Sequence, residues 1–291
     1  MGILMKLAKL YARTVYRKED ELDSLRTQKK LSLPRPPRKF AARCRSAEIG
    51  GVKAVWIDEA NAKNGVLVYL HGGAFYFGPV KEHWDYIAAI SRKTQMAALM
   101  IDYRMAPLFP FPHSLDDILE VIAASDLPPD WFFLGDSSGA TIAVAAALKL
   151  KEAGQSLPRK IILMSPWMDI TMENPDAKAD EHKDPMMTFK RLSTAAWEYA
   201  AGHDPNDPLI SPMFAELSGL SALPPVLIQI GTADLLLSDC RKFHRKLLDA
   251  GNEVIYEEYP DGFHDFMMLG ILPEAKKALL SQADFLASQP V

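Results

Sequence analysis

The stretch "WFFLGDSSGATIAVAAALKL", residues 131–150, changes from an aromatic strand pattern to an alanine-rich helix pattern within a few residues. Gly135, Ser137 and Gly139 form a G-x-S-x-G pattern at this change, which is the strand-to-helix context that such a motif requires. A turn this sharp leaves no room for side chains beside the serine, so glycines flank it and its hydroxyl is exposed. The start of the following helix favours negative charge that develops nearby. The alternative interpretation is an ordinary tight turn, because Gly-Asp-Ser is common in loops.

Short apolar runs alternate with helical patterns along most of the chain. The predicted strands are 53–60, 64–73, 95–106, 131–136, 158–167, 224–231 and 252–260, and the predicted helices are 82–94, 112–125, 137–154, 238–251 and 272–288. Apolar strands that alternate with helices indicate an α/β fold whose mostly parallel central sheet is flanked by helices on both faces. In such sheets the reactive site lies at the carboxyl ends of the strands.

Two segments break this alternation and are predicted to form a helical cap over that end of the sheet. Residues 1–50 are the N-terminal cap segment, and residues 169–212 are a cap insertion with a helical pattern at 187–203. The core is then predicted in two parts, residues 51–168 and 213–291.

The N-terminal segment begins with apolar residues at helical spacing. They are Ile3, Leu4, Leu7, Leu10, Tyr11 and Val15. This spacing predicts an amphipathic helix that packs on its own protein, with weak binding to a membrane surface as the alternative. No apolar run approaches the roughly 18 residues of a transmembrane span, so stable membrane insertion is not expected.

The composition is that of a globular protein, with 291 residues, 48% hydrophobic, 24% charged and a net charge of −4. No basic stripe is interleaved with aromatic residues, which argues against a nucleic-acid partner. Cys44 and Cys240 lie far apart and are interpreted as free thiols in a reducing compartment, so a cytoplasmic location is predicted. His182 lies in a charged segment without metal-ligand spacing, and neither a metal nor another cofactor is expected.

A second loop, "YLHGGAFYFG" at residues 69–78, places Gly72 and Gly73 directly after a predicted buried strand. Together with the Ser138 amide, their N–H groups would supply the preorganised donors that an oxyanion needs in acyl transfer. The alternative is a phosphate-binding turn, but neither G-x-G-x-x-G nor a Walker lysine is present. His71 is predicted to bond to nearby backbone and fix this loop.

An acid and a base follow later strands. Asp234 comes just after the predicted strand 224–231, and His264 lies in the loop after the next strand. A serine hydroxyl needs a base within hydrogen-bond reach, and the imidazole needs a carboxylate to orient it. The order Ser137, Asp234, His264 matches that of α/β-hydrolases. Asp239 is the second choice for the acid, although its place at the start of a helix suits capping better.

With these motifs the chain resembles the hormone-sensitive-lipase-like family, the bacterial family IV esterases of the α/β-hydrolase superfamily. The matching stretches are "HGGAFYFG", "DYRMAPLFPFP", "GDSSG", "SPW", "DPLISPMFAELSGL", "LPPVLIQIGTADLLLSD" and "GFHDF". The resemblance implies an N-terminal cap and an active site with Ser137 as nucleophile, His264 as base, Asp234 as acid, and Gly72, Gly73 and Ser138 as oxyanion donors.

The chain departs from the family pattern at a few positions. Ala74 replaces a third glycine that is common in the family, and Ser138 replaces the usual alanine. Leu108 and Phe109 stand where the family usually carries Glu and His, which puts any ion pair there in doubt.

The resemblance implies a serine carboxylesterase that hydrolyses short- to medium-chain acyl esters, with Phe75, Tyr76 and Trp84 predicted to line an apolar substrate pocket. The alternatives are a lactonase or amidase on the same triad, or a non-catalytic receptor similar to the plant gibberellin receptors. Those receptors lack the catalytic histidine, whereas His264 is present here. The family often dimerises through a terminal edge strand, so residues 252–259 are a candidate for a homodimer contact, although their glutamates can equally guard an exposed edge.

Overall fold

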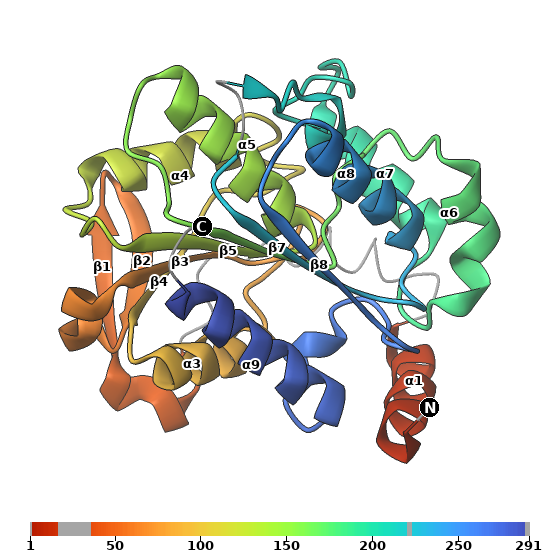
Figure 1. Cartoon of the computed structure of the whole chain (residues 1–291), viewed down its shortest axis with the longest axis horizontal. Coiled ribbons are helices and arrows are strands. Elements are labelled where there is room, and N and C mark those ends of the chain that lie inside the picture. The colour runs from red at the N-terminus through yellow and green to blue at the C-terminus, as the bar shows by residue number, and fades with distance from the viewer. Residues whose placement is uncertain (1, 17–35, 220–222, 289–291) are drawn as a thin grey trace.

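A computed structural model describes residues 2–16, 36–219 and 223–288. Within them, eight strands form one sheet in the order β1-β2-β4-β3-β5-β6-β7-β8 (Figure 1). The strands are β1 (Cys44–Ile49), β2 (Val52–Ile57), β3 (Val66–Leu70), β4 (Ala97–Ile101), β5 (Trp131–Asp136), β6 (Ile161–Met164), β7 (Val226–Gly231) and β8 (Val254–Tyr259). Pairing is antiparallel from β1 to β4 and parallel from β4 to β8. The predicted fold, a mostly parallel sheet flanked by helices, is confirmed.

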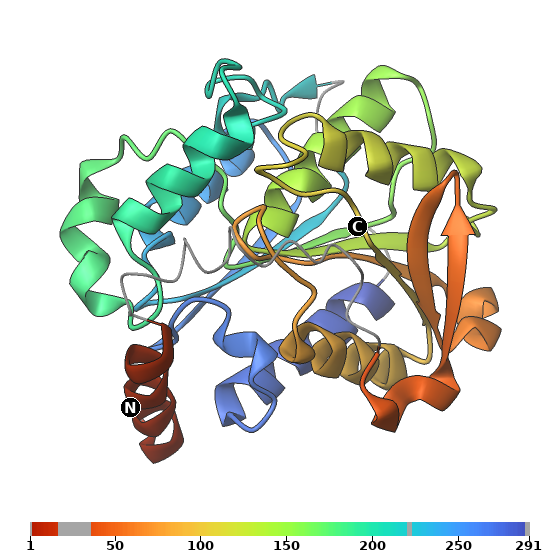
Figure 2. The same ribbon diagram turned by 180° about the vertical axis from the view of Figure 1, so that it is seen from behind.

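Helices cover both faces of this sheet (Figures 1 and 2). One face carries α3 (Lys81–Thr94) and α9 (Pro273–Ala287), and the other carries α4 (His113–Ala124), α5 (Ser138–Glu152) and α8 (Leu237–Asp249). Short 3-10 helices are η1 (Arg38–Arg43), η2 (Glu59–Asn64) and η6 (Phe266–Met268).

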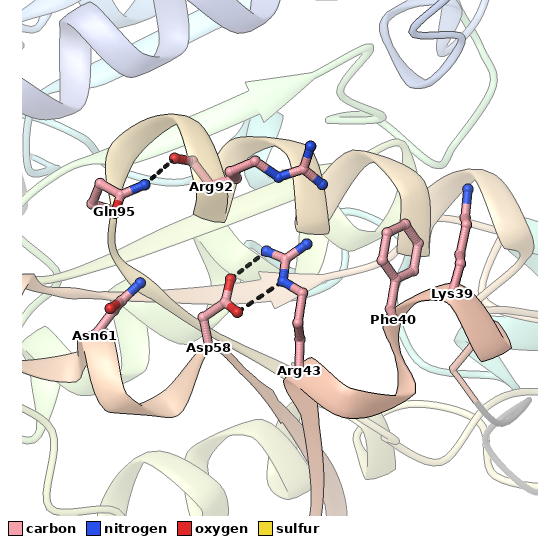
Figure 3. A pocket seen from close by; sticks show the side chains of 7 residues that line it. All are labelled: Lys39, Phe40, Arg43, Asp58, Asn61, Arg92 and Gln95. Atoms are coloured by element: carbon pink, nitrogen blue, oxygen red, sulfur yellow. Dashed lines mark hydrogen bonds and ion pairs between the residues drawn. The ribbon is translucent and has the colours of Figure 1, made fainter.

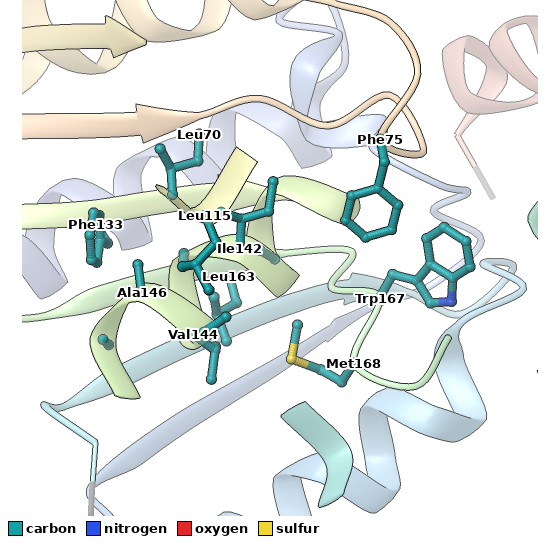
Figure 4. Close-up of a cluster of buried hydrophobic side chains, with 14 of the residues drawn as sticks. Leu70, Phe75, Leu115, Phe133, Ile142, Val144, Ala146, Leu163, Trp167 and Met168 are labelled. Atoms are coloured by element: carbon teal, nitrogen blue, oxygen red, sulfur yellow. The ribbon is translucent and has the colours of Figure 1, made fainter. Parts of the chain in front are cut away.

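The hydrophobic core is divided by the sheet into two clusters, because successive strand residues point to opposite faces. In β3, Val66, Val68 and Leu70 belong to the cluster beneath α4 and α5. Leu67 and Tyr69 belong to the cluster beneath α3 and α9. Figure 4 shows the first cluster, where side chains of α5 pack against β3, β5 and β6.

Strand β1 corrects the predicted boundary of the N-terminal cap segment at residue 50. Residues 44–49 are not cap but the edge strand of the sheet, paired with β2 from Cys44–Ile57 to Ile49–Val52. Gly50 and Gly51 form the two-residue hairpin turn with φ of 58° and 79°, the conformation that favours glycine at both positions. The strand was missed because it is half exposed and carries no apolar run.

The insertion between β6 and β7 contains α6 (Pro175–Asp180), η3 (Glu181–Lys183), α7 (Phe189–Ala200) and η4 (Pro212–Phe214). It reaches the loops at the carboxyl ends of the strands. Tyr199 of α7 stacks on Phe75 with ring centroids 3.6 Å apart, and Asp184 accepts a hydrogen bond from the Leu235 amide. These contacts hold the insertion over the end of the sheet where the reactive site was expected.

The N-terminal helix α1 (Ile3–Tyr16) forms as predicted. Its large apolar side chains, however, face away from the protein, whereas they were predicted to pack on it. Ile3, Leu4, Leu7, Leu10 and Tyr11 are 42–77% exposed, while Met5 and Ala12 are buried against the body. The side chain of Val15 and residues 17–35, which belong to the predicted cap segment, lie outside the described residues.

Two further findings concern the sequence expectations. Cys44 and Cys240 are free thiols, as predicted. In the described part of the chain, we find no helix with the length and apolar character needed to cross a membrane.

Candidate active site

The turn between β5 and α5 holds Ser137 in a strained backbone conformation. Its φ is 50° and its ψ is −120°, a combination that costs about 1–3 kcal/mol and persists only where the surroundings enforce it. The Ser137 amide donates to the Met164 carbonyl at 2.9 Å, and the Ser137 carbonyl accepts from the Trp167 amide at 3.2 Å. A Cβ atom on Gly139 would lie 2.0 Å from the Leu70 carbonyl oxygen. The second glycine of the motif is therefore required by close backbone packing.

The structure brings Ser137, His264 and Asp234 together from three loops at the carboxyl ends of β5, β8 and β7. His264 Nε2 lies 3.0 Å from Ser137 Oγ, and His264 Nδ1 lies 3.2 Å from both carboxylate oxygens of Asp234. Asp234 Oδ1 also accepts from the Leu236 amide at 2.9 Å. All three side chains are buried, with Ser137 only 2% exposed. A serine, a base and an orienting carboxylate are thus aligned for proton transfer.

The glycine loop after β3 passes directly beside Ser137. A Cβ atom on Gly72 would lie 3.0 Å from Ser137 Cβ and 2.3 Å from Asp136 Oδ2. In the described part of the chain, the amides of Gly72, Gly73 and Ser138 have no hydrogen-bond acceptor. The amide of Ala74 has none either, so it is a further candidate donor that the sequence reasoning did not include.

The Ser138 hydroxyl, which had no assigned use, accepts a hydrogen bond from the Phe75 amide at 3.1 Å. Ala74 and Phe75 both have left-handed backbone conformations, with φ of 52° and 65°, which are unfavourable for non-glycine residues. The hydroxyl therefore ties the glycine loop to the first turn of α5 and helps to maintain this bend.

His71 supports the same loop from below, as predicted. Its Nδ1 lies 2.8 Å from the Gly72 carbonyl, and its ring stacks on Tyr103 with centroids 4.6 Å apart. Burial, together with the nearby His83, lowers the pKa of His71 to about 4. The neutral ring therefore donates its Nδ1 proton to the loop, which agrees with a positioning role.

The comparisons with known proteins agree with this geometry. Residues 67–268 match the family model described as alpha/beta hydrolase fold. The chain is 31% identical over 258 residues to an esterase of Acinetobacter venetianus, covering 87% of this chain and 84% of the relative. It is 34% identical over 243 residues to an acetyl-hydrolase of Streptomyces hygroscopicus, covering 82% and 80%.

The chain belongs to the α/β-hydrolase family. A crystal structure of an esterase from the bacterial hormone-sensitive lipase family superposes with a TM-score of 0.83, at 28% identity and 98% coverage of both chains. The resemblance to hormone-sensitive-lipase-like esterases is therefore confirmed, and the hydrolase is a carboxylic ester hydrolase.

Beneath Ser137, the hydrolase has a buried polar network that the sequence pattern did not indicate. Tyr69 donates to Asp136 Oδ1 at 2.5 Å, and His83 Nε2 lies 3.3 Å from Asp136 Oδ2. The Val80 amide donates to His83 Nδ1 at 3.0 Å, so Nε2 carries the proton in the neutral ring. Burial raises the pKa of Asp136, but His83 and Tyr69 outweigh it and the net pKa is lowered. His83 lies within the predicted helix 82–94, where its sequence position gives no sign of this contact.

Two more carboxyl groups of the hydrolase lie near His264. Asp184 is fully buried and accepts from the amides of Met186 and Leu235 at 2.7 and 3.0 Å. Burial and the nearby Asp234 raise the pKa of Asp184 to about 6. Asp265 Oδ2 lies 3.3 Å from His264 Nε2. No sequence signal beyond its position next to His264 pointed to Asp265.

These carboxylates affect the proton affinity of His264. Burial by itself would lower its pKa, but the charges of Asp265 and Asp234 outweigh burial and raise the pKa to about 10. A general base must be neutral, so the activity of the hydrolase is expected to increase with pH from neutral into alkaline solution.

Replacing Asp265 by Asn is expected to shift the acidic limb of the pH profile of kcat/KM to lower pH by about one unit or more. The change removes the largest effect that raises the His264 pKa, so the neutral imidazole is present at lower pH. The measurement is kcat/KM between about pH 5 and 10. Asp261→Asn is the control, because Asp261 lies in the same loop but faces Lys9 at 3.9 Å. An acidic limb at the same pH in both variants would contradict the prediction.

The three predicted substrate-pocket residues separate in the structure. Phe75 and Tyr76 lie in the core cluster next to the insertion, where Phe75 contacts Tyr199 and Trp167. Trp84 is buried in the cluster on the opposite face of the sheet, beneath α3. The sequence pattern could not show which face of the sheet each residue occupies, because it does not show whether a tryptophan on a helix packs toward the sheet or toward the substrate site. We therefore leave Trp84 out of the candidate substrate pocket.

A surface pocket of about 390 Å³ lies at the other end of the molecule. Its lining comes from η1, η2 and the end of α3, and Gln95 lies two residues before β4, so the pocket lies near the amino end of that strand. The lining residues are Lys39, Phe40, Arg43, Asp58, Asn61, Arg92 and Gln95 (Figure 3). Arg43 and Asp58 pair with each other across it. Since none of the triad candidates lines this pocket, it is separate from the active site.

Proposed function

We propose that the hydrolase is a serine carboxylesterase that cleaves short- to medium-chain acyl esters through an acyl-enzyme on Ser137. The observation that carries the proposal is the alignment of Ser137 Oγ, the His264 ring and the Asp234 carboxylate at 3.0 and 3.2 Å. This arrangement activates a serine hydroxyl for attack on a carbonyl carbon.

In the first step, Ser137 Oγ bonds to the acyl carbon while His264 Nε2 takes the hydroxyl proton. The negative charge moves to the carbonyl oxygen, which faces the amides of Gly72, Gly73 and Ser138, with the Ala74 amide as a further donor. The bond to the alcohol oxygen then breaks, and His264 returns its proton to that oxygen. The alcohol leaves, and the acyl group remains as an ester of Ser137.

In the second step, a water molecule attacks the acyl carbon as His264 Nε2 takes one of its protons. The bond to Ser137 Oγ breaks, the proton returns to Ser137, and the carboxylic acid leaves. Asp234 holds Nδ1 throughout and stabilises the imidazolium that forms twice in each cycle.

The preference for short acyl chains rests on the aromatic enclosure beside the glycine loop. Phe75, a candidate substrate-pocket residue, stacks nearly parallel on Tyr199, with an interplanar angle of 4°. Tyr76, the other candidate, hydrogen-bonds to Glu198, which lies in α7 together with Tyr199. The names of the Streptomyces acetyl-hydrolase and of an ethyl acetate hydrolase from Pseudomonas putida agree with small acyl groups.

We expect kcat/KM for p-nitrophenyl esters to be highest for acetate to octanoate and at least about 100-fold lower for palmitate. Phe75 is buried and stacked on Tyr199, so the two rings would have to move apart to admit a long acyl chain. A serine-directed organophosphate should abolish the activity, and the uncatalysed rate serves as control. Hydrolysis of palmitate as fast as butyrate would contradict the short-chain preference. No turnover of any ester would favour the non-catalytic receptor, and turnover only of lactones or anilides would favour a lactonase or amidase.

A further inference from the structure

The large apolar side chains of helix α1 point away from the protein. On a helical wheel at 100° per residue, Ile3, Leu4, Leu10 and Tyr11 fall within about 60° of Leu7. All five are exposed, from 42% for Leu4 to 77% for Ile3. An outward stripe of this kind on one helix is unusual for a monomeric soluble protein and marks an interaction surface.

The opposite side of α1 holds the helix to the body. Met5 and Ala12 are 1% and 2% exposed and belong to the core cluster beneath α3 and α9. Lys9 pairs with Asp261 at 3.9 Å, in the loop that carries His264 three residues later. Figures 1 and 2 both show α1 projecting from a corner of the molecule. The helix therefore presents its apolar stripe outward from a fixed position next to the loop of the proposed base.

The charge of α1 indicates what covers the stripe. Its charged residues are Lys6, Lys9 and Arg13, all basic, whereas the whole chain has a net charge of −4. Lys6 and Arg13 flank the stripe on one side, at about 100–120° from Leu7 on the wheel. An apolar stripe flanked by basic residues is the pattern of helices that lie in the surface of an anionic bilayer.

The turn before α9 near the start of α1 also exposes an apolar side chain. Gly2 lies against Glu274 at the start of α9, and Ile271 in the preceding turn is 69% exposed. A second copy of the chain fits this surface less well. The stripe has five residues, fewer than the roughly 20–30 residues a side of a standard interface, and pairing two copies would bring their basic residues close together.

We propose that α1 binds the surface of an anionic lipid bilayer, with Leu7 at the centre of the inserted stripe and Lys6 and Arg13 on lipid headgroups. The helix lies in the plane of the surface and does not cross the bilayer. This places the loop of His264 near the lipid, where apolar esters concentrate.

Co-sedimentation with lipid vesicles tests this proposal. Vesicles of phosphatidylcholine alone are compared with vesicles that contain about one third phosphatidylglycerol. On the anionic vesicles, Lys6 and Arg13 should each increase the binding constant about fivefold. We expect the full chain to bind the anionic vesicles at least about tenfold more tightly, and added salt to weaken the binding. Leu7→Glu/Leu10→Glu should reduce binding to the anionic vesicles at least about tenfold.

The matched control is Leu248→Glu/Leu280→Glu, which makes the same two substitutions at leucines of α8 and α9 that are 42% and 46% exposed. It should bind as the unchanged chain does. Hydrolysis of p-nitrophenyl butyrate without vesicles should be similar for all three proteins, which shows that they are folded. Equal binding by both double variants, or no binding by the unchanged chain, would overturn the proposal. So would a dimer mass that Leu7→Glu/Leu10→Glu reduces to a monomer, since a second copy would then cover the stripe.

Discussion

Replacing Ser137 by Ala is expected to lower kcat for p-nitrophenyl butyrate by about 10⁵–10⁶ without unfolding the protein. The alanine removes the only atom that attacks the acyl carbon, while the oxyanion donors and the substrate pocket stay in place. Residual turnover comes from these groups alone. The folded state is expected to be retained, because the Ser137 side chain contributes to the fold only its contact with His264 among the described hydrogen bonds.

The neighbouring serine provides the matched control for this change. Ser138→Ala removes a hydroxyl that bonds to the Phe75 amide at 3.1 Å but leaves the Ser138 amide in place. It should retain activity within about tenfold of the unchanged enzyme, which is the scale of one hydrogen bond. More than a tenth of the original activity in Ser137→Ala would show that this serine is not the nucleophile.

Replacing Asp234 by Asn is expected to lower kcat by about 10³–10⁴. Both Asp234 oxygens face His264 Nδ1 at 3.2 Å, so the carboxylate holds the proton on Nδ1 and leaves Nε2 free to accept one. An amide at this position can donate to Nδ1, which moves the ring proton to Nε2 and removes the base that Ser137 needs. The affinity for substrate should change little, so we expect KM to stay close to that of the unchanged enzyme while kcat falls.

Asp239→Asn is the control for the acid, because Asp239 was the second choice from the sequence. It is also buried in the same segment, but its Oδ1 bonds to Asn174 at 2.5 Å and not to His264. Burial raises the pKa of Asp239 to about 6, so an amide replaces it at modest electrostatic cost. A larger loss of kcat for Asp239→Asn than for Asp234→Asn would show that the assignment of Asp234 as the acid is wrong.

Elements with a clear apolar period could be predicted from the sequence. Strands β3, β5 and β7 are fully buried and read as continuous apolar runs bounded by glycine or charged residues. Ser137, Asp234 and His264 could also be located, because they lie in the loops that follow β5, β7 and β8, and parallel strands bring their carboxyl ends to one edge.

The other features depend on contacts that a pattern does not encode. The β1 strand is half exposed and is stabilised by its hairpin and by pairing with β2, although the Gly50-Gly51 turn was a usable signal. Periodicity identified the apolar stripe of α1 but not the direction in which it points. The carboxyl group of Asp184 acts on His264 through tertiary proximity, which has no trace in the local sequence, and Asp265 had no signal beyond its position next to His264.

The most direct test of the account is to identify the residue that a serine-directed organophosphate modifies. The intact protein is treated with the reagent, digested, and analysed by mass spectrometry. We expect a single adduct on Ser137, formed in step with the loss of esterase activity, and no adduct in Ser137→Ala or after His264→Ala. An adduct on Ser138 or another serine, or full loss of activity without modification of Ser137, would contradict the proposed mechanism.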